Sequence, residues 1–307
     1  MTPTKRTLLG ALPLLAACLS LTVLSACGNN ADDDAPVSRY ELRGKIVSFD
    51  KNQQQVVIAH EPIPNFMEAM TMPFTLREPA AAYDAMRPGA QIHATLAVSG
   101  IRSWLENPVI TVVEPTAAPA PAPSDGSTLS EPTVGAEVPN FALVNQDGHK
   151  IALGQYRGRA LALTFIYTRC PLPDFCPLLS TKFAEVNRAL ESDAGLAGRS
   201  HLLSVTVDPA YDTPKVLRSY GAGHTGNFSD EKFRTWEFAT GDKGEIRRMA
   251  NYFGLAYQEE ADQIVHSLRT AVVKPDGTLL KVYRDNEWKP AELVADLRSL
   301  AGDPAAR

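Results

Sequence analysis

The chain has 307 residues, of which 44% are hydrophobic and 21% are charged. These proportions are typical of globular proteins and exclude a disordered or collagen-like chain, and the length favours two domains. The formal charge of −5, without any basic block, argues against nucleic-acid binding.

The N-terminus has the pattern of a secretory signal peptide. Lys5 and Arg6 precede residues 7–26, an apolar stretch without a charged side chain. The stretch runs into Leu-Ser-Ala-Cys at residues 24–27. This tetrapeptide resembles the bacterial lipobox, whose cysteine becomes the lipidated first residue of the mature protein.

We therefore predict a lipoprotein signal peptide over 1–26, a lipid on Cys27 and a short acidic tether over 27–37. Cys18 follows Leu-Ala-Ala and fits the same pattern, but cleavage there would leave an apolar tail on the mature chain. A retained transmembrane anchor is a further alternative, because about 20 apolar residues can span a bilayer. In each case the rest of the chain is exported to the periplasmic or extracytoplasmic side and is held at a membrane.

The first folded unit, residues 38–114, has the pattern of a small β-barrel. Short segments rich in β-forming residues are separated by turn residues such as Pro88 and Gly89. Several short strands in so short a stretch favour a barrel. We expect strands over 40–49, 55–60, 72–76, 91–98 and 109–113.

A cluster of soft metal ligands lies in this unit. Met67, Met70 and Met72 are three of the six methionines of the chain, and His60 precedes them. In a strand Met70 and Met72 point to the same face, and thioether sulfur with imidazole suits Cu(I) or Ag(I) where thiols would be oxidised. The alternative is that these methionines fill gaps in the core.

This stretch resembles the small periplasmic copper-binding modules of the CusF type, which are OB-like β-barrels that use one histidine and a Met-x-Met pair. The resemblance implies His60, Met70 and Met72 as Cu(I) ligands. Those modules cover the metal with a tryptophan three residues before the first methionine, where this chain has Met67. Met67 then becomes a further ligand, or Phe66 does the covering.

The second folded unit, residues 134–303, follows an Ala/Pro-rich linker over 115–133 that is typical of a semi-rigid spacer. It alternates strands and helices, which predicts an α/β domain with a central sheet. The apolar run 160–167 is typical of a strand buried on both faces. We expect further strands over 201–207 and in a hairpin of 270–273 with 278–283, and helices over 178–192, 214–220, 243–253 and 292–300.

Cys170 and Cys176 are the two cysteines outside the signal region. Cys170 follows the buried strand and precedes a helix, where an α/β sheet places its ligands and where the helix dipole favours a thiolate. Two thiolates with a histidine suit Cu(I), and the same thiolates support disulfide exchange. A plain structural disulfide is the third alternative.

Six segments of the second unit match one family in order. They include Phe-Ile-Tyr-Thr-Arg-Cys-Pro at 165–171 and His-Ser at 266–267, and the others are 176–177, 207–214, 236–241 and 275–277. This unit resembles the SCO/SenC family, thioredoxin-fold proteins that bind copper and serve cytochrome c oxidase assembly. The resemblance implies Cys170, Cys176 and His266 as ligands of Cu(I) or Cu(II), and a copper-accepting partner such as an oxidase subunit.

The chain departs from the usual pattern of that family in two places. Five residues separate Cys170 from Cys176, where three are usual, and Val265 replaces an aspartate before His266. The longer loop must fold back to bring the sulfurs within the reach of a disulfide. We expect a preformed turn that lets the thiols alternate between copper binding and disulfide formation; if the sulfurs stay apart, only a metal can bridge them.

These patterns favour an exported, lipid-anchored copper chaperone with an OB-like barrel and a thioredoxin-like domain. The barrel would capture or buffer Cu(I), and the second domain would deliver copper or keep the thiols of an acceptor reduced. The alternative is an enzyme, a thiol–disulfide oxidoreductase in which Cys170 attacks and Cys176 resolves. A third reading, in which the barrel alone is functional, conflicts with the intact Cys/Cys/His set.

Overall fold

The computed structural model describes residues 36–52, 54–77, 85–99, 102–112, 132–226, 228, 233–260 and 263–301. The predicted signal peptide over 1–26, the lipidated Cys27 and nearly all of the 27–37 tether lie outside these residues. The same holds for nearly all of the linker over 115–133. These boundaries therefore stay predictions.

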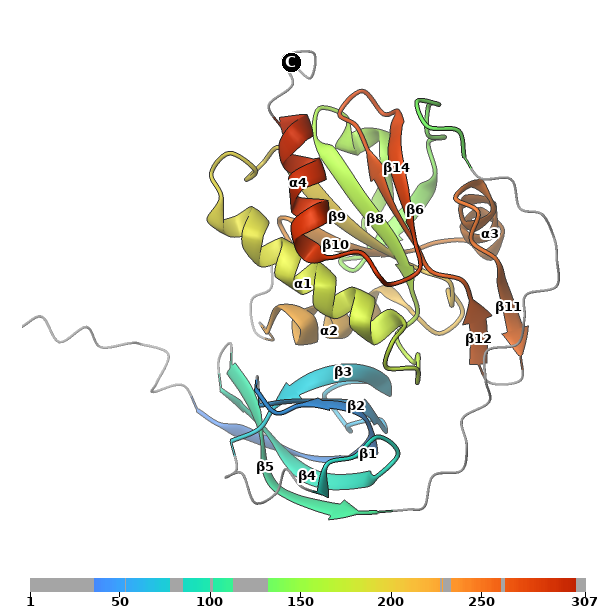
Figure 1. The fold of residues 1–307 in the computed structure, drawn as a ribbon. Coiled ribbons are helices and arrows are strands. Elements are labelled where there is room, and N and C mark those ends of the chain that lie inside the picture. The colour runs from blue at the N-terminus through green and yellow to red at the C-terminus, as the bar shows by residue number, and fades with distance from the viewer. Residues whose placement is uncertain are drawn as a thin grey trace, which may run out of the picture. The chain divides into compact units, whose positions relative to one another are not determined.

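The first folded unit is a curled antiparallel sheet of five strands (Figure 1). The strands are β1 (Ser38–Asp50), β2 (Gln55–His60), β3 (Met70–Thr75), β4 (Gln91–Ser99) and β5 (Arg102–Thr111). Their order in the sheet is β3-β2-β1-β4-β5, and a bridge between Leu76 and Leu105 links its two ends. Leu42, Ile46 and Ile58 are at most 1% exposed, because alternation along the strands puts them on the inner face.

The last strand of this unit is longer than the sequence predicts. The prediction places its start at residue 109, whereas β5 begins at Arg102 and continues through Asn107 and Pro108. Asn107 has a positive φ of 52°, and the register of β5 against β4 shifts at this point. This bulge bends the strand and accommodates a proline that would otherwise interrupt the pairing.

The second folded unit has the predicted α/β architecture, with a seven-stranded sheet. Its strands are β6 (Ala142–Asn145), β7 (Lys150–Ala152), β8 (Ala160–Ile166), β9 (Ser200–Thr206), β10 (Trp236–Thr240), β13 (Arg269–Val273) and β14 (Leu279–Arg284). The sheet order is β14-β13-β8-β9-β10-β6-β7. Strands β8, β9 and β10 run parallel, and the outer strands pair antiparallel to their neighbours.

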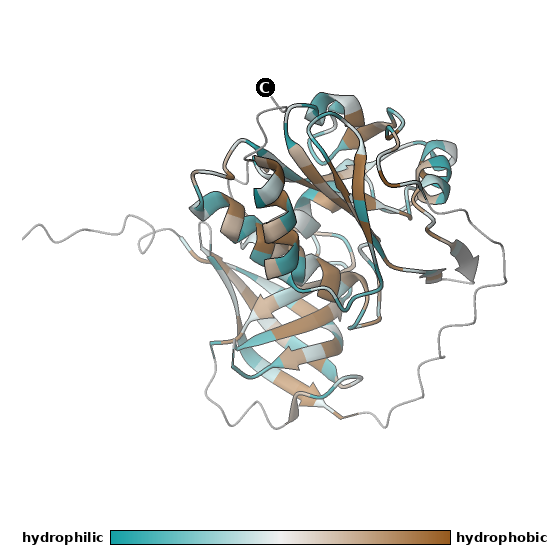
Figure 2. Ribbon diagram, turned by 45° about the horizontal axis from the view of Figure 1, so that its top comes forward, coloured by the Kyte–Doolittle hydropathy of each residue, from teal (hydrophilic) through white to brown (hydrophobic). Residues whose placement is uncertain are grey.

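In the described part of this unit, four α-helices and the 3₁₀ helix η2 (Leu153–Tyr156) accompany the sheet. The α-helices are α1 (Cys176–Ser192), α2 (Pro214–Thr225), α3 (Lys243–Tyr252) and α4 (Pro290–Ala301). Helices α1 and α4 lie side by side over β8 (Figure 1). Every residue of β8 and β9 is buried, which confirms the prediction for 160–167. Brown, hydrophobic segments of ribbon lie in the interior of the domain (Figure 2).

Two hairpins escape the sequence analysis. One is β6–β7, which turns at Asp147 and Gly148, where Asn145 Oδ1 accepts hydrogen bonds from the N–H groups of Asp147 and His149. The other pairs β11 (Tyr257–Glu260) with β12 (Gln263–His266). Each strand has four residues or fewer, so that alternation along it is too short to separate from chance.

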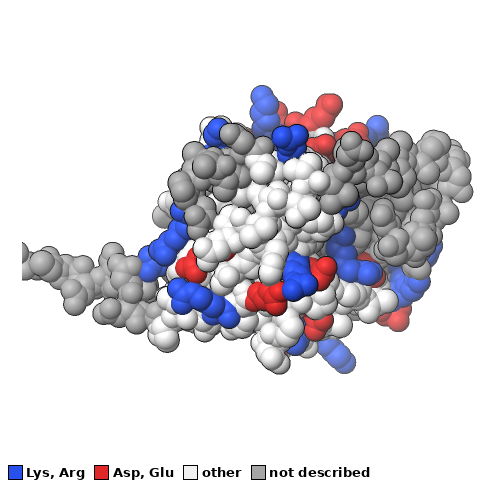
Figure 3. All heavy atoms as spheres, turned by 90° about the horizontal axis from the view of Figure 1, so that it is seen from below, with Lys and Arg blue, Asp and Glu red and all other residues white. Residues whose placement is uncertain are grey.

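In the part of the chain that the structure describes, no helix is both long enough and apolar enough to cross a bilayer. On the face shown in Figure 3, basic and acidic side chains are interspersed around an uncharged centre. The coloured residues of that view form no block of one sign.

Candidate metal centres

The two thiols lie where strand β8 passes into helix α1. Cys170 sits in the connecting loop and Cys176 is the first residue of α1. They are 1% and 0% exposed, respectively, and both are free thiols. Within the loop the N–H of Phe175 donates to the carbonyl of Leu172 at 3.2 Å, and Cys170 Sγ lies 3.9 Å from the same carbonyl oxygen. The ability to close a disulfide stays a prediction.

His266, the last residue of β12, points its ring at this pair. Its Nε2 lies 3.3 Å from Cys176 Sγ, and its Nδ1 lies 2.9 Å from the carbonyl oxygen of Ser267. With a proton on Nδ1 donated to that carbonyl, Nε2 carries the lone pair, the arrangement that proteins use to orient a metal-binding histidine. Burial lowers the pKa of His266 to about 4, so the ring is neutral at pH 7 and available to a metal.

The two thiols differ in acidity. Burial raises the pKa of Cys170, but hydrogen bonds from Cys176 and from backbone groups outweigh it, so the pKa ends below its usual value. The pKa of Cys176 is raised, first by complete burial and then by the adjacent Cys170. Cys170 is therefore the first of the pair to become a thiolate, the form that binds metal and attacks disulfides.

Acidic side chains of the 207–214 segment hold the loop that carries Cys170. The carboxylate of Asp212 accepts hydrogen bonds from the Thr168 N–H at 3.1 Å and from the Thr168 hydroxyl at 2.5 Å. The hydroxyl of Thr206 donates to the same carboxylate. Burial raises the pKa of Asp212 to about 6. The sequence analysis assigned no role to this residue, because its contact depends on tertiary structure.

A second carboxylate in that segment holds the next residue of the loop. Asp208 accepts a hydrogen bond from the Arg169 guanidinium at 2.7 Å, and the same guanidinium lies 4.0 Å from the centre of the Tyr211 ring. Thr168 and Arg169, the two residues before Cys170, are therefore both held by carboxylates of the 207–214 segment.

Of the residues described, no three His, Cys, Asp or Glu side chains gather closely enough to hold a metal as they stand. Cys176 Sγ and His266 Nε2 lie 3.3 Å apart. A metal ion with bonds of about 2.0–2.3 Å can bind to two atoms at this separation. Of the predicted set, Cys176 and His266 are thus close enough to share a metal ion, and Cys170 as a third ligand stays a prediction.

In the barrel, strand pairing brings His60, Met70 and Met72 onto one face. His60 lies opposite Met70, and Ile58 lies opposite Met72, across β2 and β3. The three side chains are at most 3% exposed. The thioether and imidazole side chains therefore share one face of two neighbouring strands, as the Met-x-Met spacing predicts, and their role as ligands stays a prediction.

The imidazole of His60 is arranged like that of His266. Its Nδ1 lies 2.7 Å from the carbonyl oxygen of Glu61, and its Nε2 is buried without a hydrogen-bond partner. Burial lowers the pKa of His60 to about 4. A buried, neutral ring nitrogen with a free lone pair fits a soft metal ion, and a buried polar atom without a partner is otherwise costly.

Met67, which stands where the CusF-type modules have a tryptophan, is part of a tight turn. The N–H of Met67 donates to the carbonyl of Ile63 at 3.1 Å, and the carbonyl of Met67 accepts from the Ile63 N–H. Met67 is 5% exposed, and its role as a ligand stays a prediction. Phe66 stacks on Tyr40 with ring centres 4.3 Å apart, whereas Phe74 meets the His60 ring edge-on at 5.7 Å. The sequence analysis missed this contact of Phe74.

Comparison with known proteins gives two family matches. Residues 130–302 match the family model described as SCO1/SenC, and residues 39–102 match the model described as copper binding periplasmic protein CusF. The chain is 28% identical over 179 residues to the SCO1 protein homolog of Bacillus subtilis, which is 57% of this chain and 87% of that protein.

Two further proteins show the same likeness. The identity to the mitochondrial SCO2 homolog of Bos taurus is 28% over 163 residues, which is 51% of this chain and 56% of that protein. The structure of Arabidopsis thaliana ScoI with copper bound is similar at a TM-score of 0.45 and 22% identity, covering 53% of this chain and 97% of that one. Since the SCO1/SenC model matches more than half of the residues, this chain belongs to the SCO1/SenC family, with a thioredoxin-like domain that follows a CusF-like barrel.

Proposed function

We propose that this protein is an extracytoplasmic copper chaperone with two copper sites, one in each folded unit. The observation that carries the proposal is the contact of His266 Nε2 with Cys176 Sγ at 3.3 Å, with Nδ1 held by the Ser267 carbonyl. A neutral imidazole beside a thiol pair is a ligand set that selects copper over harder cations.

The thiol site would hold copper as cargo through Cys170, Cys176 and His266. Thiolates stabilise Cu(I), and the nitrogen of His266 also supports Cu(II). Because a thiol must lose its proton to bind a metal, the lowering of the pKa of Cys170 by its hydrogen bonds, against the opposing effect of burial, favours capture there first. Cys176 would release its proton as the ion arrives.

The barrel site would hold Cu(I) through His60, Met70 and Met72, with Met67 as a further ligand. Thioethers carry no proton to displace, and they do not form disulfides in an oxidising compartment. This site therefore suits capture or buffering of Cu(I), and the thiol site suits delivery.

The acceptor would be a protein that itself binds copper, such as a subunit of cytochrome c oxidase. The family membership and the SCO relatives support an assembly role of this kind. Export by the signal peptide and a lipid on Cys27 would hold both sites at a membrane, on its periplasmic or extracytoplasmic side.

A second candidate function is reduction of a disulfide in the acceptor. The observation that favours it is the acidity order of the thiols, with the pKa of Cys170 lowered and that of Cys176 raised. The Cys170 thiolate would attack the acceptor disulfide and release one acceptor thiolate. Cys176 would then lose its proton and attack the mixed disulfide, which releases the second acceptor thiolate and leaves Cys170 and Cys176 oxidised.

The test is the number of Cu(I) ions bound by the purified, reduced protein in competition with a chromophoric Cu(I) chelator. We expect two ions for the wild type, one for Cys176→Ser and one for Met70→Leu with Met72→Leu. His149→Ala removes an exposed histidine outside both sites and serves as the control with two ions. Two ions bound by Cys176→Ser would contradict the thiol site, and two ions bound by the methionine variant would contradict the barrel site.

A further inference from the structure

A cavity of about 430 Å³ opens in the α/β domain at the opposite end of β8 from the cysteine loop. It lies between the short 3₁₀ helix η2 (Leu153–Tyr156), the first residues of β8 and the turn after β13. Its volume is that of a pocket for a small molecule. Its lining combines apolar side chains, such as Val138 and Leu153, with the cations Arg157, Arg159 and Lys274.

Two of these cations are not paired with a carboxylate among the residues that the structure describes. Arg159 and Lys274 are both half-buried. The contacts of the Arg159 guanidinium are to His201 Nδ1 at 3.5 Å and to the Tyr156 ring at 5.3 Å. Lys274 interacts electrostatically with Asp276, whose carboxylate is not part of the cavity lining and accepts hydrogen bonds from the N–H and hydroxyl of Thr278. Among the charged residues that line the cavity, three cations stand against the single carboxylate of Glu137, so the lining carries a net positive charge.

The third cation, Arg157, differs from the other two because its guanidinium has an acidic partner. Arg157 donates to Glu137 Oε1 at 2.5 Å and to the carbonyl of Asp276 at 2.7 Å. A Cβ on Gly277 would lie 2.8 Å from the Arg157 guanidinium carbon, and Gly277 has a φ of 88°. Arg157 is thus held by Glu137 and the 275–277 turn, whereas Arg159 and Lys274 have no carboxylate within ion-pair distance among the described residues.

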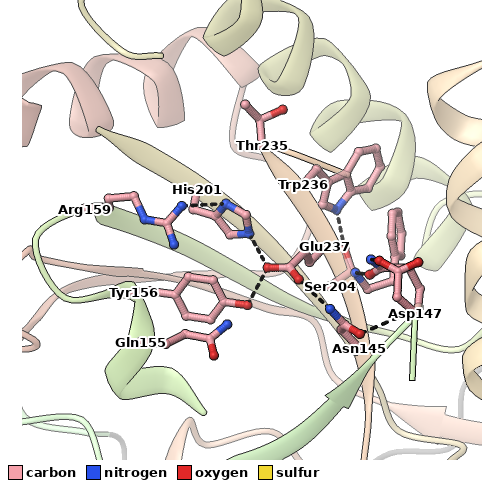
Figure 4. Close-up of polar contacts among 12 residues, drawn as sticks. Asn145, Asp147, Gln155, Tyr156, Arg159, His201, Ser204, Thr235, Trp236 and Glu237 are labelled. Atoms are coloured by element: carbon pink, nitrogen blue, oxygen red, sulfur yellow. Dashed lines mark hydrogen bonds and ion pairs between the residues drawn. The ribbon is translucent and has the colours of Figure 1, made fainter. Parts of the chain in front are cut away.

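A buried polar network behind the cavity fixes Arg159 (Figure 4). His201, on which Arg159 rests, is 2% exposed, and its Nε2 lies 2.9 Å from Glu237 Oε2. Tyr156 donates its hydroxyl to the same carboxylate at 2.8 Å and stacks on His201. Asn145 donates to the other oxygen of Glu237 at 2.8 Å.

This network leaves Glu237 satisfied before any ligand arrives. Burial raises the pKa of Glu237, but the hydrogen bonds from His201, Asn145 and Tyr156 lower it to about 2. The carboxylate is therefore ionised, accepts hydrogen bonds from Asn145 and Tyr156, and lies 2.9 Å from His201 Nε2. It orients His201 and through it Arg159, rather than neutralising the guanidinium directly.

We propose that this cavity binds a small organic anion, with its carboxylate or phosphate head on Arg159 and Lys274 and a short apolar body against Val138 and Leu153. Both head groups offer the oxygens that a guanidinium recognises. Preorganisation by the buried network reduces the cost of ordering Arg159 on binding. The site is separate from both copper sites and does not depend on copper binding.

The test is a titration of the purified, copper-free protein with sodium phosphate, acetate and butyrate at constant ionic strength, followed by amide NMR. We expect saturable shifts confined to the cavity, at the amides of Gly154 and Gly277. Tighter binding of phosphate than of acetate assigns a phosphate head, and the reverse order assigns a carboxylate. Tighter binding of butyrate than of acetate assigns the apolar body. Shifts that never saturate with any of the three anions would overturn the proposal.

Variants separate this site from general attraction of anions to the surface. Arg159→Gln should weaken binding by about tenfold or more, and Lys274→Gln should weaken it in the same direction. Arg188→Gln, the same change on an exposed side of α1, should leave the affinity unchanged. If Arg159→Gln fails to fold, Lys274→Gln decides alone. Equal affinity for Lys274→Gln and Arg188→Gln would refute the proposal.

Discussion

The two candidate copper sites share one imidazole arrangement and differ in their sulfur ligands. In each, Nδ1 of the histidine faces the carbonyl of the next residue, and Nε2 is directed away from it. In each, burial lowers the pKa of the histidine to about 4. The barrel adds thioethers on paired strands, whereas the α/β domain adds thiols on a loop and a helix start.

This difference shows that one arrangement of a buried histidine can be combined with thioethers or with thiols, which differ in their response to pH and to oxidants. Thioethers bind without releasing protons and do not form disulfides, so the barrel site should respond little to pH above 5 or to oxidants that form disulfides. Thiols must ionise to bind and can be oxidised to a disulfide. The thiol site should therefore respond strongly to both.

The largest effect we expect comes from Gly44→Ala in the barrel. A Cβ at residue 44 would lie 2.5 Å from the carbonyl oxygen of Ala59 and 2.7 Å from the Cα of His60. Backbone atoms of a paired strand cannot give way, so the free energy of unfolding should fall by about 3 kcal/mol. Cu(I) binding by the barrel should fall with it while the thiol site keeps its ion.

Chemical denaturation and Cu(I) titration of the same variant check this prediction. Gly244→Ala, in the first turn of α3, is the control, because its nearest contact would be the end of the Asp242 side chain. Wild-type stability of Gly44→Ala would show that the two strands are not packed as closely as the structure has them.

The second effect is a loss of stability in acid. Because the pKa of buried His266 is lowered to about 4 from 6.5, the unfolded chain binds more protons than the folded chain between these values. Stability contributed by the neutral ring is present at pH 7 and is lost as the pH falls below about 6.5. Between pH 7 and pH 5 the loss from one such histidine is about 2 kcal/mol.

Urea unfolding of the copper-free protein at pH 7 and pH 5 measures this loss. Other buried groups titrate in the same range, so the comparison is with His266→Gln. The wild type should lose about 2 kcal/mol more than this variant. Equal losses in the two proteins would mean that His266 titrates normally and is not held neutral by burial.

The smallest effect concerns the support of the cysteine loop. Asp212→Asn replaces an acceptor of three hydrogen bonds with an amide that has one acceptor oxygen and a donor group. The free energy of unfolding should fall by about 1–2 kcal/mol, and Cu(I) affinity of the thiol site should fall while that of the barrel is unchanged. Thr206→Val, which removes one donor to the same carboxylate, should give a smaller shift in the same direction. An unchanged thiol-site affinity in Asp212→Asn would contradict a positioning role.

The sequence predicted much of this architecture because the underlying signals are local. Alternation in the barrel, the apolar run of β8 and the hairpin around Pro275 to Gly277 each depend on a few neighbouring residues. The Met-x-Met spacing alone puts Met70 and Met72 on one face. The pairing of His60 with Met70 follows from the turn between β2 and β3, which the sequence does not specify.

Contacts between distant segments could not be predicted in this way. The three hydrogen bonds of Asp212 join it to the ends of β8 and β9, and no local pattern encodes them. The network of His201, Glu237 and Tyr156 likewise joins two strands and a 3₁₀ helix. The first part of β5, residues 102–108, was not predicted, because a proline such as Pro108 normally ends a strand. The bulge at Asn107 lets the strand continue past it.

X-ray absorption at the copper edge tests the central claim, two soft sites of different sulfur chemistry, most directly. The samples are Cu(I)-loaded Cys170→Ser with Cys176→Ser, and Cu(I)-loaded Met70→Leu with Met72→Leu. We expect nitrogen and sulfur scattering from one copper ion in each variant. The cysteine variant keeps the barrel site, so its sulfur signal should be retained at pH 5. The methionine variant keeps the thiol site, so its sulfur signal should weaken at pH 5. Copper surrounded by nitrogen and oxygen alone in either variant at pH 7 would contradict the claim.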